Sequence, residues 1–246
     1  TVTVNVPGHS TPTFPVGLDL AVAVGVLAAQ GDLGRDLLDD WVFLGELSLD
    51  GLLRPVAGVL PVVMEAHFAS LDVIVPAGNA GEAALVSTVH CVAAESLADV
   101  IGHLNGTTAL PRVVTAAQSV ETASAGIDLS DVAGQAHVKR ALEIAAAGGH
   151  SLLMVGPPGS GKTMLARRMA TILPPLTAAE AMEVTVIHSL AGLLRRRTGL
   201  LRQRPFRAPH HTASVAALTG GGAHPRPGEV SLAHRGLLFI GELPEW

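Results

Sequence analysis

The glycine-rich segment at residues 156–163 carries the residue types that hold a triphosphate. It reads Gly-Pro-Pro-Gly-Ser-Gly-Lys-Thr and fits G-x-x-x-x-G-K-[ST]. In this pattern backbone N–H groups surround the β-phosphate, and the dipole of the following helix favours negative charge at its N-terminus. The Lys162 ammonium reaches the β- and γ-phosphates, and the Thr163 hydroxyl binds Mg²⁺. The sequence therefore predicts a phosphate loop for ATP and Mg²⁺, made of Gly156, Pro157, Pro158, Gly159, Ser160, Gly161, Lys162 and Thr163.

The segments that flank the phosphate loop have the patterns of a strand and a helix. Residues 151–155 form a short apolar run typical of a buried strand, and residues 162–173 have one apolar face before two prolines end the pattern. Two more helices are predicted, over residues 137–147 and, from a capping box that Thr177 opens, over residues 177–189. Because a strand, a glycine loop and a helix follow in this order, the motif has the context that phosphate binding requires.

The first half of the chain alternates between helix and strand signals. Its patterns predict helices over residues 19–30, 59–68, 81–86 and 95–104, and strands over residues 1–6, 41–49, 72–75 and 89–92. Such alternation is typical of a small α/β or α+β layered domain. This half offers no catalytic motif of its own.

Charge divides the chain into two parts. Residues 1–130 carry 14 acidic and three basic side chains, whereas the remaining residues carry 7 acidic and 13 basic ones. This asymmetry predicts two domains and places any polyanion partner on the second. No apolar run is long enough to span a bilayer, and the single cysteine, Cys91, forms no internal disulfide. With no signal peptide at Thr1, we expect a soluble, cytoplasmic piece of a longer protein without membrane contact.

In the first half, a family resemblance rests on residues 43–47, 51, 54–56, 58–60, 74–76 and 79. With these residues the half resembles the proteolytic domain of Lon, which has the ribosomal protein S5 domain 2-like fold. Lon chemistry needs a serine that a lysine activates. Both lysines of this chain lie beyond residue 130, Leu60 stands where Lon has its lysine, and no serine occurs near Asp19. We therefore expect a Lon-like domain without peptidase activity.

The second half resembles the Mg-chelatase-like AAA+ ATPases, in particular their YifB/ComM branch of competence-related helicases. Besides the phosphate loop, the resemblance rests on residues 131–135, 139–150, 172–176, 204–212, 220–222, 227–229 and 231–234. It implies a ring-forming ATPase, usually a hexamer, that moves on DNA. It also implies that the backbone of Val132 and Ala133 lies near the adenine, and that residues 225–229 belong to a β-hairpin insertion.

One position departs from the family pattern. After a predicted strand over residues 236–240, the family has Asp-Glu-Leu-Pro-Glu, whereas this chain has Gly241 followed by Glu242. The resemblance assigns Glu242 the polarisation of the attacking water, alongside Lys162 as a catalytic residue. The missing aspartate would hold the water shell of Mg²⁺, on which phosphoryl transfer relies. The departure therefore argues against hydrolysis and leaves nucleotide binding intact.

These observations combine into one organisation. We expect a Lon-like domain over residues 1–104 that lacks its N-terminal part, a linker over residues 105–127, and a C-terminally truncated AAA+ core over residues 128–246. The parent function would be ATP-driven DNA remodelling, such as branch migration during DNA uptake and recombination. The alternatives are an ATPase subunit of a metal chelatase, which would lack the Lon-like domain, and a degenerate nucleotide-binding or oligomerisation module.

Three groups of polar side chains have a less specific reading. Four histidines, His210, His211, His224 and His234, favour hydrogen bonding in a subunit interface or pore loop over zinc, since adjacent histidines do not easily face one ion. Glu180 and Glu183 are interpreted as a solvated helix face. The arginines at 195–197 have two open interpretations, a solvated loop and a phosphate contact.

Overall fold

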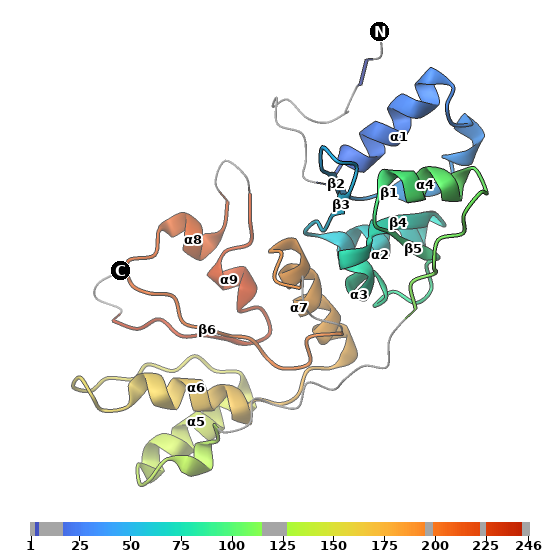
Figure 1. Ribbon diagram of the computed structural model, residues 1–246. Helices are drawn as coiled ribbons and strands as arrows, with labels where there is room; N and C mark the ends of the chain where they lie inside the picture. The colour runs from blue at the N-terminus through green and yellow to red at the C-terminus, as the bar shows by residue number, and fades with distance from the viewer. Residues whose placement is uncertain (1–2, 5–16, 115–126, 195–198, 222–224, 243–246) are drawn as a thin grey trace. The chain divides into compact units, whose positions relative to one another are not determined.

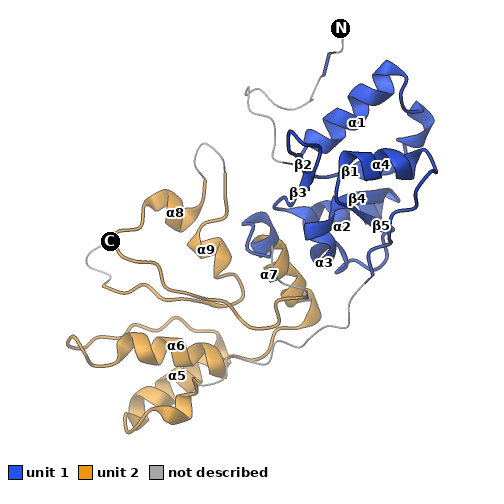
Figure 2. Cartoon of the chain, in the orientation of Figure 1, with its two compact units in different colours: residues 1–119, 188–199 blue, residues 120–187, 200–246 orange. Residues whose placement is uncertain are grey.

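The computed structural model describes residues 3–4, 17–114, 127–194, 199–221 and 225–242. The chain divides into two units, residues 1–119 with 188–199 and residues 120–187 with 200–246 (Figure 2). Most of the predicted strand at residues 1–6, the arginines at 195–197 and His224 lie outside the described residues.

The first unit is built on a three-stranded parallel sheet. Its strands β1 (Trp41–Phe43), β4 (Asp72–Pro76) and β5 (Cys91–Ala94) lie in the order β1-β4-β5 (Figure 1). Parallel neighbours need crossover connections. Helix α2 (Val59–Ala69) lies in the connection from β1 to β4, and a 3-10 turn (Ala77–Asn79) with the short helix α3 (Ala80–Ala83) connects β4 to β5. Helices α1 (Asp19–Gln30) and α4 (Leu97–Leu104) and a second 3-10 turn (Arg35–Leu37) also belong to this unit.

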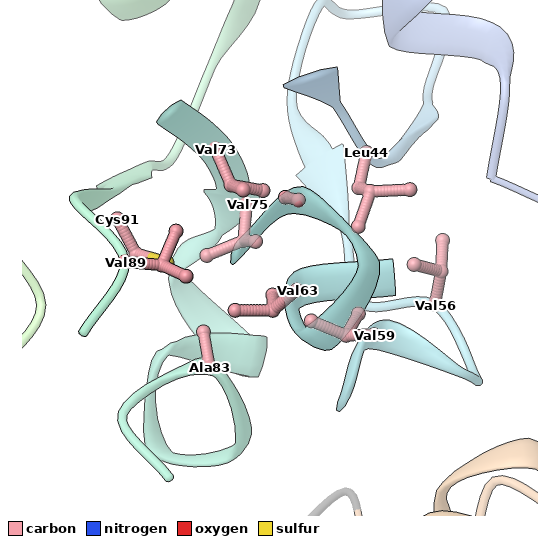
Figure 3. Packing of buried hydrophobic residues seen from close by; sticks show 10 residues of the cluster. Leu44, Val56, Val59, Val63, Val73, Val75, Ala83, Val89 and Cys91 are labelled. Atoms are coloured by element: carbon pink, nitrogen blue, oxygen red, sulfur yellow. The ribbon is translucent and has the colours of Figure 1, made fainter. Parts of the chain in front are cut away.

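Both faces of the sheet are covered. Successive side chains of β4 point to opposite faces, so Val73 and Val75 pack with Val59 and Val63 of α2 in one cluster (Figure 3). Ile74, between them, belongs to a second cluster with residues of α1, β5 and α4, among them Leu20, Val24, Val92 and Val100. This two-sided burial explains why β4 is a continuous apolar run.

The sheet differs from the sequence prediction in where its strands end. The strand predicted over residues 41–49 is divided, because Gly45 (φ +154°) turns the chain and donates its N–H to Gly17 O at 3.0 Å. The continuation, β2 (Glu46–Leu47), instead pairs antiparallel with β3 (Leu53–Arg54). The strand expected at residues 89–92 begins later, at Cys91, and the helix expected at residues 81–86 is limited to Ala80–Ala83. In the expected linker, Val113 donates to Cys91 O at 2.8 Å.

A buried polar cluster holds the N-terminus of α2. The Glu82 carboxylate accepts from Leu60 N (3.0 Å) and Asn79 Nδ2 (3.2 Å), and it also accepts from the Ser189 hydroxyl. Gly58 N donates to Ser189 O at 3.0 Å. All three side chains are buried, and the cluster satisfies them without a positive charge. Ser189 lies in helix α7 (Ala178–Leu190), whose residues from 188 onward belong to the first unit.

The second unit packs helices around a smaller core. A 3-10 turn (Leu129–Asp131), α5 (Ala136–Gly148) and α6 (Lys162–Ile172) enclose Leu129, Val132, Leu142, Leu165 and Met169. Strands β6 (Phe206–Arg207) and β7 (Leu237–Leu238) pair in parallel, and the short helices α8 (Val215–Thr219) and α9 (Glu229–Leu232) lie between them in sequence. The chain is therefore a mixed α/β protein with parallel strand pairing, as predicted at this level.

The strand predicted just before the phosphate loop is wrong in this structure. Residues 151–155 are described and have no regular secondary structure, and the side chains of Leu153 and Val155 are 75% and 90% exposed. A strand exists only with a hydrogen-bonded neighbour, and within the described chain β6 and β7 pair with each other instead.

Among all the residues that the structure describes, no helix is long and apolar enough to cross a membrane.

Candidate nucleotide-binding site

The phosphate loop leads directly into α6. Gly159 and Gly161 have φ of +79° and +86°, a backbone conformation that glycine adopts without the Cβ penalty. Gly161 is the residue that precedes α6, and no side chain caps this helix N-terminus. Among the described residues, no side chain therefore caps the first N–H groups of this helix, as an anion site at a helix N-terminus requires.

Lys162 contacts the loop itself. Its Nζ donates to Gly156 O at 2.7 Å and to Pro157 O at 2.9 Å, and it lies 3.4 Å from Ser160 Oγ. The ammonium thus donates hydrogen bonds to backbone carbonyl groups of the loop that precedes it. A bound triphosphate would replace these neutral acceptors with charged ones, which form stronger hydrogen bonds to an ammonium.

The segment before α5 contacts the start of α6 and the side chain of Arg168. A Cβ placed on Gly161 would lie 3.9 Å from Gln135 Nε2, so the Gln135 amide adjoins the start of α6. Arg168 of α6 donates its Nε to Asp128 O at 3.0 Å and forms a 3.7 Å ion pair with Asp131. Between them Val132 is buried in the core, whereas Ala133 is exposed. The structure therefore packs Val132, one of the two predicted adenine-side residues, against α6, the helix that follows the phosphate loop.

Glu242 follows β7 and contacts a histidine. Phe239 N donates to Arg207 O at 2.8 Å, which extends the β6–β7 pairing beyond the strands. Beyond it, His211 Nδ1 lies 2.7 Å from Glu242 Oε2, and Glu242 has a φ of +54°. Among the described residues, no hydrogen bond joins Glu242 to Lys162, so the structure does not bring these two predicted catalytic residues into direct contact.

Gly241 has room for a side chain. Its φ is not in the left-handed region, and a Cβ at this position would lie 3.3 Å from Phe239 Cε1. A small movement of the Phe239 ring would relieve that contact. The absence of the family's aspartate is therefore not imposed by the backbone at this position.

Glu183 lies on an exposed face, as interpreted, and Glu180 is half-buried, and both also form ion pairs there. The capping box is confirmed, since Thr177 N donates to Glu180 Oε2 at 2.9 Å and Glu180 N to Thr177 Oγ1 at 3.2 Å. Glu183 in turn accepts from Arg235 Nε at 2.9 Å and lies 3.0 Å from His234 Nε2, and these two side chains lower the pKa of the Glu183 carboxyl. Arg204 adds a 3.8 Å pair to Glu180. Sequence reasoning missed this network because its partners lie far apart in the chain.

A second ion pair joins two of the sequence motifs. The Arg207 guanidinium donates Nε and Nη2 to the two carboxylate oxygens of Glu229, each at 2.5 Å. This bidentate geometry is the strongest that the two side chains can form. It joins β6 to the first residue of α9, and the hydrogen bonds from Arg207 hold the pKa of Glu229 below its usual range.

The Arg207–Glu229 pair predicts a pH-dependent contribution to stability. Because the pKa of Glu229 is lowered in the folded chain from 4.5, the pair stabilises above that pH and loses its effect as the pH falls through the folded value. The side chains are partly exposed, so water screens the pair to at most about 1 kcal/mol. Glu229→Gln should lower the melting temperature at neutral pH and have a smaller effect at acidic pH, once the pH falls below 4.5 and then through the folded pKa of Glu229.

Glu143→Gln is the matched control, because Glu143 pairs with Arg140 on an exposed helix face. Melting curves of both variants, read by circular dichroism across this pH range, give the comparison. An equal loss for Glu229→Gln at both pH values would show that packing, not charge, accounts for the effect.

Three of the four histidines contact polar side chains within the chain, and their role in a subunit interface or pore loop stays a prediction. His210 Nδ1 lies 2.9 Å from Thr212 Oγ1, while His211 and His234 contact Glu242 and Glu183. In the described part of the chain, no three metal-ligating side chains gather into a group that could hold an ion. Of the expected hairpin insertion, Gly221 and Arg226 form one antiparallel bridge.

Comparison with known proteins gives a consistent result over the chain. A family model described as magnesium chelatase, subunit ChlI, matches residues 128–246, and one described as subunit ChlI of Mg-chelatase matches residues 1–79. YifB of Salmonella typhimurium, an uncharacterised protein, is 47% identical over 247 residues, and the competence protein ComM of Haemophilus influenzae is 44% identical over 250 residues. Both alignments cover 100% of this chain and 48% of the relative.

The chain belongs to the Mg-chelatase-like family of YifB and ComM. An uncharacterised protein of Mycobacterium tuberculosis extends the set, at 48% identity over 92% of this chain. The chain spans about half the length of these relatives. The Mg-chelatase-like match over residues 128–246 contains the phosphate loop, the Arg207–Glu229 pair, His211 and Glu242.

Proposed function

We propose that this chain binds ATP with Mg²⁺ at the phosphate loop, as the nucleotide-binding part of an AAA+ ATPase. The observation that carries the proposal is the uncapped N-terminus of α6 behind a glycine loop, with Lys162 held at the same loop. In this site the loop N–H groups and Lys162 would bind the phosphates, and the Thr163 hydroxyl would reach the metal ion. Mg²⁺ would supply charge neutralisation at the phosphates.

The proposed architecture follows the family resemblance. We infer a non-proteolytic Lon-like domain over residues 1–104, a linker over residues 105–127, and an AAA+ core over residues 128–246. The parallel β6–β7 pair and the family match over the second half support the AAA+ assignment. In the parent protein, this core would assemble into a homohexameric ring in the cytoplasm.

Nucleotide turnover is proposed to be negligible in this chain. Glu242 is present to polarise water, but Gly241 offers no carboxylate to orient the water shell of Mg²⁺. Mg²⁺ demands near-octahedral geometry and keeps several of its waters, so the group that orients them matters. Binding without turnover is therefore the behaviour that the residues support.

DNA is the proposed macromolecular partner. Support comes from the basic second half of the chain and from ComM, whose printed name is competence protein. Contacts to phosphates release counterions, so affinity for single-stranded DNA should fall steeply with salt. Replacing Arg195, Arg196 and Arg197 together by glutamine should make the slope of log affinity against log salt less steep by about 2.

The matched control replaces the three arginines of the first half, Arg35, Arg54 and Arg112, by glutamine. This variant has the same net charge as the variant at residues 195–197, but it should retain the wild-type slope of log affinity against log salt. Fluorescence anisotropy of a labelled oligonucleotide at several salt concentrations measures both. Equal slopes for the two variants, or a wild-type affinity that ignores salt, would contradict a DNA contact in the second half.

The second candidate function is an ATPase subunit of a metal chelatase. It is favoured by the family descriptions, which name a subunit of magnesium chelatase. A Lon-like domain would argue against this candidate, but the model that matches residues 1–79 is itself described as subunit ChlI of Mg-chelatase, so the comparisons do not separate the two candidates. A third reading, a degenerate module that binds nucleotide and oligomerises, is favoured by Gly241 and would show ATP binding without any response to DNA.

A further inference from the structure

Helix α7 is divided between the two units. Its residues up to 187 belong to the second unit, whereas its last turn and the turn that follows have the colour of the first unit in Figure 2. We call residues 188–194 the strap. Within the strap, Gly192 N donates to Ser189 O at 2.8 Å, which continues the path of α7 as a turn. The first unit is therefore completed by a segment that follows the phosphate loop in the sequence.

Ser189 joins the strap to the N-terminus of α2 through its backbone and its side chain. Its carbonyl accepts from Gly58 N at 3.0 Å, and its hydroxyl donates to the Glu82 carboxylate. Gly58 has a φ of +78°, and a Cβ there would lie 3.3 Å from Leu190 Cδ2, so a glycine permits this close approach. Ser189 and Leu194 are both buried. The strap is thus packed against the first unit by polar and apolar contacts.

The Glu82 carboxylate depends on the strap for one of its hydrogen bonds. It is buried, and it accepts from Leu60 N at 3.0 Å and from Asn79 Nδ2 at 3.2 Å as well as from Ser189. These donors are all uncharged. A buried charge is costly unless hydrogen bonds satisfy it, so removal of the Ser189 hydroxyl leaves the carboxylate poorly satisfied. Docking of the strap and capping of α2 by Glu82 therefore favour each other.

The remaining turns of α7 are held within the second unit. Glu180 lies 3.8 Å from Arg204, and Glu183 accepts from Arg235 Nε at 2.9 Å. Arg204 also donates its Nε to Pro174 O, in the segment that follows α6. One helix thus has ion pairs within the second unit along its first turns and a buried hydrogen-bond cluster within the first unit at its last turn.

We propose that α7 is a coupling helix, and that the strap, closed by Ser189 on Glu82, is its docking segment on the first unit. A helix forms cooperatively, and its local opening exposes contiguous residues together. Loosening the ion pairs of Glu183 in the second unit therefore weakens the strap, and the change reaches the N-terminus of α2. This coupling goes beyond the proposed nucleotide site and does not depend on ATP.

Hydrogen exchange at the Gly58 amide gives the first test, because this N–H donates to the strap itself. In amide exchange measured by NMR on the whole chain, Ser189→Ala should exchange Gly58 at least about tenfold faster, since the lost hydrogen bond was made to a charged group. The control is Ser87→Ala, which changes an exposed serine of the same unit and should leave Gly58 unchanged. Equal exchange in Ser189→Ala and the wild type overturns the role of the strap.

The coupling is tested from the second unit. Glu183→Gln removes only an exposed charge, and it should exchange Gly58 at least about twofold faster. The control is Glu143→Gln, which breaks an exposed ion pair on α5 of the same unit. The Val73 amide, bonded to His90 O within the first unit, should keep its wild-type rate in each variant.

Two results overturn the coupling. One is a Gly58 rate in Glu183→Gln that equals the rate in Glu143→Gln. The other is an equal acceleration at Gly58 and Val73, which would mean general destabilisation of the first unit. If Ser189→Ala fails to fold, Glu183→Gln still decides the proposal, because its substitution lies on an exposed face of α7.

Discussion

Lys162→Ala lowers the affinity of this chain for ATP by at least tenfold. The substitution removes the one ammonium that the structure holds at the phosphate loop, 2.7 Å from Gly156 O and 2.9 Å from Pro157 O. A hydrogen bond to a charged group contributes about 1.5–3 kcal/mol. Since about 1.4 kcal/mol corresponds to tenfold in affinity, the expected loss is about 10- to 100-fold. Isothermal calorimetry with ATP and Mg²⁺ measures it.

The chain provides a matched control for this experiment. Lys139, in α5, is the other of its two lysines, and Lys139→Ala changes the net charge by the same amount. If general electrostatic attraction dominated, both variants would lose affinity alike. An unchanged affinity for Lys162→Ala would show that residues 156–163 do not bind the phosphates, and the proposed function would fail with it.

Gly241→Asp should strengthen metal binding and, with it, allow turnover. The new carboxylate would follow β7, next to Glu242, and the Cβ meets Phe239 Cε1 at 3.3 Å, a contact that a small ring movement relieves. An outer-shell partner of this kind changes metal affinity or activity about 10- to 100-fold. We therefore expect Mn²⁺, used as a spectroscopic substitute for Mg²⁺, to bind the ATP-loaded variant at least about tenfold more tightly.

Gly241→Asn is the control, because it has the shape of aspartate without the charge. It should leave metal affinity near that of the wild type. Steady-state phosphate release in a polypeptide of the relatives' full length extends the test to turnover. Equal and robust rates for the wild type and Gly241→Asp would show that another group orients the metal waters, and the inactive-site interpretation would be wrong.

Local sequence patterns predicted much of the candidate site. The glycines of the phosphate loop, followed by an apolar-faced helix, predicted α6 to within one residue of its observed end at Ile172. The capping box at Thr177 predicted the start of α7. These predictions succeed because helix capping and glycine conformation depend on residues only a few positions apart. The continuous apolar run likewise predicted β4, because a strand that is buried on both faces is apolar at successive positions.

By itself, the sequence determined the longer helices, the central strand, the glycine-rich loop before α6 and the family to which the chain belongs. Only the tertiary structure decided that residues 151–155 form no strand, because strand formation depends on a neighbour that composition does not reveal. It also decided that Glu180 pairs with Arg204 and that Glu183 pairs with Arg235, both distant in the chain. The same holds for His211 and Glu242, whose contact follows from the β6–β7 register. In each case the interaction joins segments that are distant in the chain, and only the packing of those segments brings the groups within reach.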